Sequence, residues 1–184
     1  IISLVEICNI LLSFRIWDTS VKFIGSNIND STKISKYITL SFLTSIASSL
    51  ISFLVIVFVA SNFIENFFSN NIGAKELIAS YATVVLFIST NEIIDGILRV
   101  YNKYSYIFRI NTYTNLFRLI LILLLVLKLN PNIQNIIYCF IFSYLFGFIV
   151  RILFLKITFK DNGISINKLN MPDFKSSMDF IKFM

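Results

Sequence analysis

The sequence predicts an all-α protein, a polytopic bundle of transmembrane helices with about five spans and the start of a sixth. Of its 184 residues, 57% are hydrophobic and 14% are charged, and the mean hydropathy is +0.80. A soluble domain usually carries about 25% charged residues. Apolar windows of about 20 residues recur, which is the length that a helix needs to cross a bilayer. Strict alternation over ten-residue segments, the pattern typical of an outer-membrane barrel, is absent from the sequence.

The residue types also limit the chemistry that the chain can perform. Cys8 and Cys139 lie inside apolar runs without CxxC spacing, which is typical of small buried hydrophobic residues rather than of a disulfide or a metal site. The sequence contains no His and its carboxylates are dispersed. We therefore expect neither a metal site nor a cofactor.

The first expected span, about residues 1–25, is apolar but interrupted by polar side chains on two faces. These are Glu6, Asn9, Ser13 and Ser20 on one face, and Arg15, Asp18 and Lys22 on nearly the opposite one. Two interpretations stay open: the helix lines a cavity, which we favour, or its lower turn lies in the membrane interface. A simple salt-bridged helix end, with Asp18 paired to Arg15 or Lys22, would also explain the charges.

Four further spans follow, at about residues 37–60, 77–101, 106–129 and 133–159. A serine stripe on the first of these and Ser143-x3-Gly147 on the last predict close helix packing in lipid. The short YNKYS connection makes the third and fourth antiparallel neighbours. We thus divide the chain into a transmembrane bundle (1–159), a basic cytoplasmic linker (160–177) and the start of another transmembrane helix (178–184).

The distribution of positive charge predicts the orientation. Lysines and arginines gather on one side of the alternating spans, and only Lys75 and Lys128 fall on the other. The groups on the richer side are Lys22, Lys33 and Lys36, then Arg99, Lys103 and Arg109, then the basic residues from Arg151 to Lys182. The positive-inside rule places that side in the cytoplasm. This asymmetry accounts for the net charge of +6 without a nucleic-acid partner.

Residues 91–118 carry the candidate site. Glu92, Asp95 and Arg99 fall on one helical face together with Asn91 and Asn102. The following helix repeats the spacing with Asn111, Thr114, Asn115 and Arg118. An ionisable group at the bilayer centre costs about 2.5–3.5 kcal/mol, so such groups usually face a cavity or a partner. This pattern indicates a transport pathway.

Arginines are the candidate substrate-binding groups. Arg15, Arg99 and Arg118 lie in or near the membrane, and a guanidinium presents a rigid fork of donors that matches phosphate. We assign Asn115, on the same face as Arg118, to the same site. Snorkelling to the interface is the alternative for Arg99.

Carboxylates are the candidate ion-coupling groups. Glu6, Glu92 and Asp95 suit a proton or sodium relay, because intramembrane carboxylates commonly form one. The alternative for Asp95 is an i, i+4 pair with Arg99. Glu92 is the best single coupling candidate.

These features resemble a known family. An interrupted helix ending in RIWDTSVKFIG, a basic loop, a serine-rich span and then NEIIDGILRVYNKYSYIFRINTYTNLFR follow in the order seen in the first half of bacterial oligosaccharide flippases of the O-antigen type. These belong to the multidrug/oligosaccharidyl-lipid/polysaccharide exporter superfamily. Gly96-Ile97-Leu98-Arg99 and Arg118 are similar to that family's helix-ending motif and Arg-containing fifth helix. The resemblance covers most of the chain, as a fragment from helix two to the start of helix seven of a longer protein.

The resemblance implies a transporter in the cytoplasmic membrane rather than an enzyme. Two six-helix halves would surround a cavity that opens alternately to either side and passes a polyprenyl-pyrophosphate-linked oligosaccharide across. The expected partners are this lipid-linked oligosaccharide, membrane lipid, and a polysaccharide polymerase with other assembly proteins.

Three alternatives remain. A drug/cation antiporter of the same superfamily should have an acidic and aromatic site rather than an arginine-lined one. A membrane-embedded polysaccharide polymerase or glycosyltransferase would need a substantial loop with convergent acids or His. A purely structural membrane subunit would not need Glu92, Asp95 and Arg118 within its spans.

Overall fold

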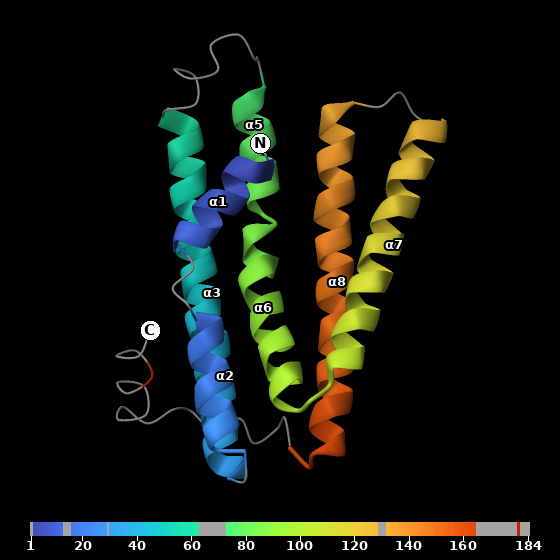
Figure 1. Ribbon diagram of the computed structural model, residues 1–184. Helices are drawn as coiled ribbons and strands as arrows, with labels where there is room; N and C mark the ends of the chain where they lie inside the picture. Colours follow the sequence, from blue (N-terminus) through green and yellow to red (C-terminus); the bar gives the residue numbers. More distant parts are fainter. Residues whose placement is uncertain are drawn as a thin grey trace.

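The structure, a computed structural model, describes residues 2–12, 16–28, 30–62, 73–128, 132–164 and 180. Every element in this part of the chain is a helix (Figure 1). The helices are α1 (Ile2–Leu12), α2 (Ile16–Ser26), α3 (Ser31–Asn62), α5 (Ala74–Ala82), α6 (Val85–Val100), α7 (Tyr104–Lys128) and α8 (Ile133–Asp161). The predicted all-α class is confirmed.

Four stretches are long and apolar enough to cross a membrane. They are Thr32–Val59, Lys75–Val100, Tyr104–Leu127 and Ile133–Asp161. Large apolar side chains on the outward faces of α3, α7 and α8 are exposed, among them Phe58, Leu127 and Phe142. This is the surface that a bilayer would cover, and the chain is a helical membrane protein.

The first expected span differs from the prediction. The structure has two helices there, α1 and α2, of 11 residues each. At 1.5 Å per residue each is about 16 Å long, which is short of the roughly 30 Å hydrocarbon core. In Figure 1 α1 crosses α3 obliquely, whereas α2 runs along it. Among the described residues the long apolar helices number four rather than five.

The predicted span at 77–101 is interrupted between α5 and α6. Thr83 and Val84 donate backbone hydrogen bonds to Ser80 and Tyr81, at the i→i+3 spacing of a tightened turn. The Thr83 hydroxyl also donates to the Ser80 carbonyl at 2.8 Å. Irregular backbone at membrane depth is tolerated where protein covers it. Val84 and its neighbours Ala82 and Val85 are fully buried, so this condition is met.

The connection between α6 and α7 is the tight turn that the sequence predicts. Asn102 takes a left-handed conformation (φ 55°), and the amides of Asn102 and Lys103 donate to the carbonyls of Arg99 and Leu98. This Schellman arrangement ends α6 and satisfies its last carbonyls. Lys103 Nζ lies 3.1 Å from the Asp161 carboxylate, which joins the turn to the end of α8.

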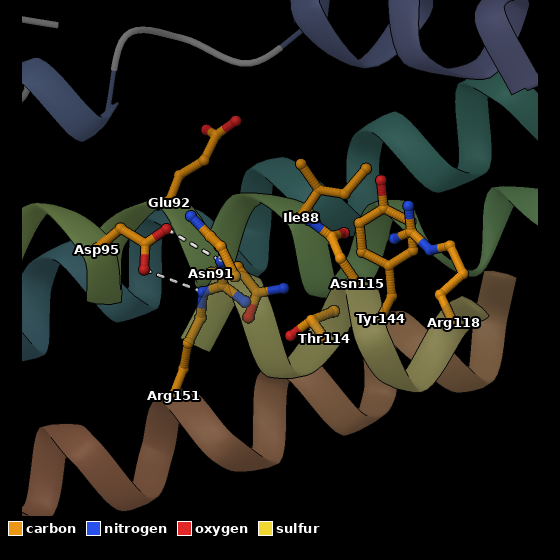
Figure 2. A pocket seen from close by; sticks show the side chains of 10 residues that line it. Ile88, Asn91, Glu92, Asp95, Thr114, Asn115, Arg118, Tyr144 and Arg151 are labelled. Atoms are coloured by element: carbon orange, nitrogen blue, oxygen red, sulfur yellow. Dashed lines mark hydrogen bonds and ion pairs between the residues drawn. The ribbon is translucent and has the colours of Figure 1, made fainter. Parts of the chain in front are cut away.

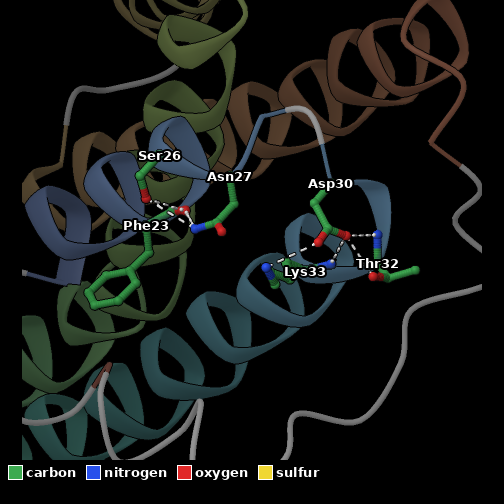
Figure 3. A network of polar contacts seen from close by, with 6 residues as sticks. All are labelled: Phe23, Ser26, Asn27, Asp30, Thr32 and Lys33. Atoms are coloured by element: carbon green, nitrogen blue, oxygen red, sulfur yellow. Dashed lines mark hydrogen bonds and ion pairs between the residues drawn. The ribbon is translucent and has the colours of Figure 1, made fainter.

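Asp30 caps the start of α3 (Figure 3). Its Oδ1 accepts from the backbone amides of Thr32 and Lys33 at 3.2 and 3.1 Å and from the Thr32 hydroxyl at 2.6 Å. The Lys33 ammonium lies 3.3 Å from Oδ2. The Thr32 hydroxyl and the Lys33 amide, with Lys33's charge, lower the pKa of Asp30 to about 2.

The serine stripe of α3 packs as predicted. Ser41, Ser45, Ser48, Ser49 and Ser52 are all at least nine-tenths buried. They lie on the face with which α3 meets its neighbouring helices, and small side chains there let helix backbones approach closely.

Candidate functional site

A polar pocket of about 300 Å³ lies between α6, α7 and α8 (Figure 2). All its lining residues belong to three candidate membrane spans, so it lies at membrane depth. The lining residues are Ile88, Asn91, Glu92, Asp95, Asn111, Thr114, Asn115, Arg118, Tyr144 and Arg151. Two carboxylates and two guanidiniums give it a formal charge of zero.

Helical spacing explains how the sequence assembles this lining. On α6, Ile88, Asn91, Glu92 and Asp95 follow the i, i+3, i+4, i+7 pattern, and Asn111, Thr114, Asn115 and Arg118 repeat it on α7. Tyr144 and Arg151 are seven residues apart on α8. One face of each helix therefore supplies the polar groups, as predicted for α6 and α7.

An ion pair that the sequence reasoning missed lies at one end of the pocket (Figure 2). Arg151 Nε and Nη2 donate to the two carboxylate oxygens of Asp95 at 3.0 and 3.1 Å. Nη2 also donates to Asn111 Oδ1 at 2.9 Å, and Nη1 to the Gly147 carbonyl at 3.4 Å. Arg151 thus joins α8 to α6 and α7, and its charge is neutralised by Asp95.

Arg151 changes one expectation and one alternative interpretation. It was placed with the cytoplasmic charges, yet it is 9% exposed and lies inside the α8 span. For Asp95, the alternative interpretation was an i, i+4 pair with Arg99 within α6, and in the structure Asp95 pairs with Arg151. Tyr144 and Arg151 are seven residues apart, which places them on one face of α8. This spacing was the signal in the sequence that could have predicted Arg151 as a pocket residue.

The other end of the pocket is formed around Arg118, close to the middle of the α7 span. Its Nε donates to the Ser143 hydroxyl at 2.9 Å. Its guanidinium lies over the rings of Phe140 and Tyr144, 4.8 and 5.1 Å from their centroids. Among the described residues no acceptor bonds to the two terminal nitrogens. Arg118 is therefore positioned by α8 while two of its nitrogens remain available to a ligand.

Neutral and acidic groups line the space between these ends. The Asn91 side chain is 6% exposed, and its Oδ1 has no hydrogen-bond partner. Glu92 is exposed, and Figure 2 shows its carboxylate pointing away from the Asp95–Arg151 pair. Asn115 is likewise exposed, while Thr114 is buried and donates to the Ile110 carbonyl.

Close contact between α7 and α8 depends on Gly147. A Cβ at this position would lie 2.9 Å from Thr114 Oγ1 and 3.2 Å from Arg151 Nη1. The Ser143-x3-Gly147 motif, predicted as packing, therefore also positions both arginines of the pocket: Ser143 bonds Arg118, and Gly147 leaves room for Arg151.

The remaining predicted residues lie away from the pocket lining. Arg99 is exposed, and its guanidinium stacks over the Trp17 ring of α2 at 5.1 Å. Glu6 on α1 accepts a hydrogen bond from the Tyr81 hydroxyl at 3.4 Å. Arg15 lies outside the described residues, as do residues 165–179 and 181–184 of the expected linker and next helix.

No family model, curated protein or solved structure matches this chain.

Proposed function

We propose that this chain forms part of a membrane transporter that moves a polyprenyl-pyrophosphate-linked oligosaccharide across the cytoplasmic membrane by alternating access. The observation that carries this proposal is Arg118, a guanidinium near mid-membrane with two uncommitted nitrogens in a polar pocket. A charged group at this depth is costly, so charges in membrane spans usually face a partner or line a substrate or ion pathway.

The contrast between the two arginines supports an anionic substrate. Arg151 is bonded on every nitrogen and its charge is balanced by Asp95. Arg118 has a hydroxyl and two aromatic rings as its neighbours, none of which carries a compensating charge. The planar fork of a guanidinium matches phosphate oxygens. We therefore assign Arg118 to the pyrophosphate and Asn115 to a neighbouring polar group of the substrate.

The size of the pocket indicates which part of the substrate it receives. About 300 Å³ is at the small end of ligand pockets and suits a pyrophosphate or one sugar rather than a whole repeat unit. The polyprenyl chain would remain in membrane lipid. A polymerase and other assembly proteins would then act on the translocated oligosaccharide.

Glu92 is the proposed coupling group, with Asp95 and Glu6 as further candidates. Its carboxylate has no partner among the described residues, and it lies in the same pocket as Arg118. Binding of a proton or sodium ion there would change the charge of the pocket from zero to +1. This change would strengthen the attraction of the pocket for an anionic substrate. Ion binding would thereby be coupled to substrate transport.

A drug/cation antiporter is the second candidate. It is favoured by the free Glu92 carboxylate, the unpartnered Asn91 oxygen and the Tyr144 ring, which together could hold an organic cation. In that case Arg118 would repel the substrate, and its removal would not impair transport.

Complementation of cells that lack their own repeat-unit flippase tests the proposal. Arg118→Ala and Arg118→Lys would be compared with wild type in the full-length protein, at matched membrane abundance. Arg109→Ala is the matched control, because Arg109 is an exposed arginine of α7 outside the pocket lining. Surface polysaccharide is the readout.

We expect wild type and Arg109→Ala to restore surface polysaccharide. Arg118→Ala should restore about ten- to hundredfold less polysaccharide, because this factor corresponds to the free energy of one hydrogen bond to a charged group. Arg118→Lys should fall between them. Equal rescue by Arg118→Ala would contradict the anionic substrate. Drug resistance that survives Arg118→Ala and is lost in Glu92→Gln would establish the antiporter instead.

A further inference from the structure

A buried tyrosine, Tyr81, lies between Glu6 of α1 and the pocket. Its side chain is fully buried near the end of α5, just before the break in the span. Its hydroxyl donates to Glu6 Oε1 at 3.4 Å and is also within hydrogen-bonding reach of the Tyr144 side chain. Tyr144 belongs to the pocket lining. Two tyrosine hydroxyls therefore connect Glu6 with the pocket, although Glu6 is not one of the lining residues.

Ring packing holds Tyr81 against the same face of α8 that positions Arg118. The Tyr81 ring meets the Phe140 ring edge-on, with 6.4 Å between the centroids. Phe140 is one turn from Tyr144, and the Arg118 guanidinium lies over both rings, 4.8 and 5.1 Å from their centroids. Figure 2 shows the Tyr144 ring standing out from α8 beside Arg118, with its hydroxyl at the end away from the helix. Tyr144 is therefore in contact with both Tyr81 and Arg118.

Tyr81 is the group that bonds Glu6 in this part of the molecule. Glu6 is the only charged residue of α1, and its side chain is partly exposed. Helix α1 packs chiefly on α3, α5 and α6, and α3 carries no charged residue from Ile38 to Asn62. The charged and titratable side chains of α5 and α6 are Lys75, Glu76, Tyr81, Glu92, Asp95 and Arg99. Asp95 is paired with Arg151, Arg99 stacks on Trp17, and Tyr81 donates to Glu6.

The ionisation state of Glu6 decides which way the two tyrosine hydroxyls point. An ionised carboxylate only accepts hydrogen bonds, and each tyrosine has a single O–H to donate. With Glu6 ionised, Tyr81 donates to it, and the Tyr81 oxygen is left to accept from Tyr144. The one hydroxyl hydrogen of Tyr144 is then directed at Tyr81 and away from a ligand in the pocket.

Protonation of Glu6 by water from the solvent reverses this order. A neutral carboxyl group can donate its own O–H to the Tyr81 oxygen. The Tyr81 hydrogen then turns to the Tyr144 oxygen, and the Tyr144 hydrogen becomes available to an acceptor in the pocket. Only hydroxyl hydrogens rotate, and no proton passes from one tyrosine to the other.

We propose that Tyr144 donates a hydrogen bond to the anionic ligand bound by Arg118, and that Glu6 controls this donor through Tyr81. This role rests on the proposed function, which supplies the anionic ligand. Anion binding and protonation of Glu6 then favour each other, because both select the same orientation of the hydroxyls. A sodium ion at Glu6 has no hydrogen to donate to Tyr81, so the ion coupled at this position is a proton.

Binding of inorganic pyrophosphate to the purified full-length protein in detergent tests the control by Glu6. At pH 7, Glu6→Gln imitates the protonated carboxyl group, because its amide can donate to Tyr81. It should bind pyrophosphate about two- to tenfold more tightly than wild type, the factor that corresponds to one neutral hydrogen bond. Glu76→Gln is the matched control, since it removes the same charge from an exposed residue of α5, and it should bind like wild type.

The effect of Glu6→Gln should disappear when either tyrosine hydroxyl is removed. In Tyr81→Phe and in Tyr144→Phe, which keep the rings, the added Glu6→Gln change should leave the affinity for pyrophosphate unaltered. A tightening that survives in Tyr81→Phe would show that the charge of Glu6 acts directly through space. That result would overturn the proposal.

Melting temperatures of the same variants test the connection without a ligand. We expect the losses of Glu6→Gln and Tyr144→Phe to be non-additive when Tyr81 is present and additive in Tyr81→Phe. Additive losses in the presence of Tyr81 would overturn the proposal whatever the binding result. If neither wild type nor Glu6→Gln binds pyrophosphate while the losses are non-additive, the proposed function fails and the connection from Glu6 to Tyr144 is supported.

Discussion

Single residues in the pocket differ in how fully their charges are matched. The Asp95–Arg151 pair is bidentate and mostly buried, with side chains 17% and 11% exposed. Arg118 has no acidic partner among the described residues and is held by Ser143, Phe140 and Tyr144. The first arrangement suits a fixed connection between helices, and the second suits an exchangeable ligand.

Removing one member of the buried pair should destabilise the protein strongly. Arg151→Met leaves the Asp95 carboxylate without its partner, and such changes cost about 3–5 kcal/mol of unfolding free energy. Asp95→Leu should cost a similar amount, because it leaves the Arg151 guanidinium unpaired, and Asp95→Leu/Arg151→Met should recover much of the loss, because it leaves no charge unpaired. Unfolding titrations in SDS measure all four proteins. If the double variant loses as much unfolding free energy as the two single variants together, the pair does not act as a unit.

Asp30 makes the stability of the α3 N-terminus depend on pH. Its pKa is lowered to about 2, below the usual carboxylate value near 3.9. A carboxylate with a depressed pKa stabilises the folded state above the unfolded value, and this stabilisation is lost as the pH falls through the folded one. Asp30→Ala should therefore melt below wild type by the same margin at pH 7 and pH 5, and the margin should shrink from pH 4 downward. A margin that is unchanged at pH 2.5 would contradict this account of the cap.

At the scale of helices, close approach of α7 and α8 sets the geometry of the pocket. Gly147→Ala should destabilise the protein by about 1–3 kcal/mol, because its Cβ meets Thr114 Oγ1 and Cγ2 at 2.9 and 3.1 Å. Thr114→Ala removes both clashing atoms, so the Gly147→Ala/Thr114→Ala double variant should be more stable than Gly147→Ala alone. Thermal melts in detergent provide the measurement.

Gly25→Ala is the matched control for this prediction. It also lies in a helix, and nothing is found within 4 Å of its added Cβ. Alanine there should be tolerated or mildly stabilising, since glycine is the weaker helix former. Equal losses at both positions would show that contact with Thr114 is not the cause.

The helical spacing of polar groups predicts the pocket faces of α6 and α7 from the sequence, because both depend on local periodicity alone. Other features could not be predicted in this way. Arg151 meets Asp95 across 56 residues of sequence, and such a contact is not a property of spacing. The break at Thr83 carries no Pro or Gly, and its conformation depends on burial by neighbouring helices. Arg99 stacks on Trp17 because Gly96 lets α2 approach α6 closely. A Cβ added to Gly96 would lie only 3.1 Å from the Trp17 ring.

At the scale of the whole molecule, the ends of α2, α6 and α8 and the starts of α3 and α7 lie at the same end of the bundle (Figure 1). Lys33, Lys36, Lys103 and Lys160 lie in or next to these termini. This clustering supports a cytoplasmic location for this end under the positive-inside rule.

Cysteine labelling in intact cells checks the orientation. In a background without Cys8 and Cys139, we expect Ser105→Cys, at the start of α7, to be protected from an impermeant reagent until the cells are opened. Ile133→Cys, at the start of α8 and 62% exposed, should react from outside. The reverse pattern would invert the topology.

The central claim is that a polar, water-accessible pocket lies at membrane depth between α6, α7 and α8. The most direct measurement is modification of Asn115→Cys by a small charged thiosulfonate reagent in native membranes, again without the native cysteines. Ile120→Cys is the control, because it is a nearby exposed residue of α7 outside the pocket lining. A thiol reacts as the thiolate, which forms in water and not in hydrocarbon. We expect Asn115→Cys to react and Ile120→Cys to remain unmodified; an Asn115→Cys thiol as inert as the control would contradict the account.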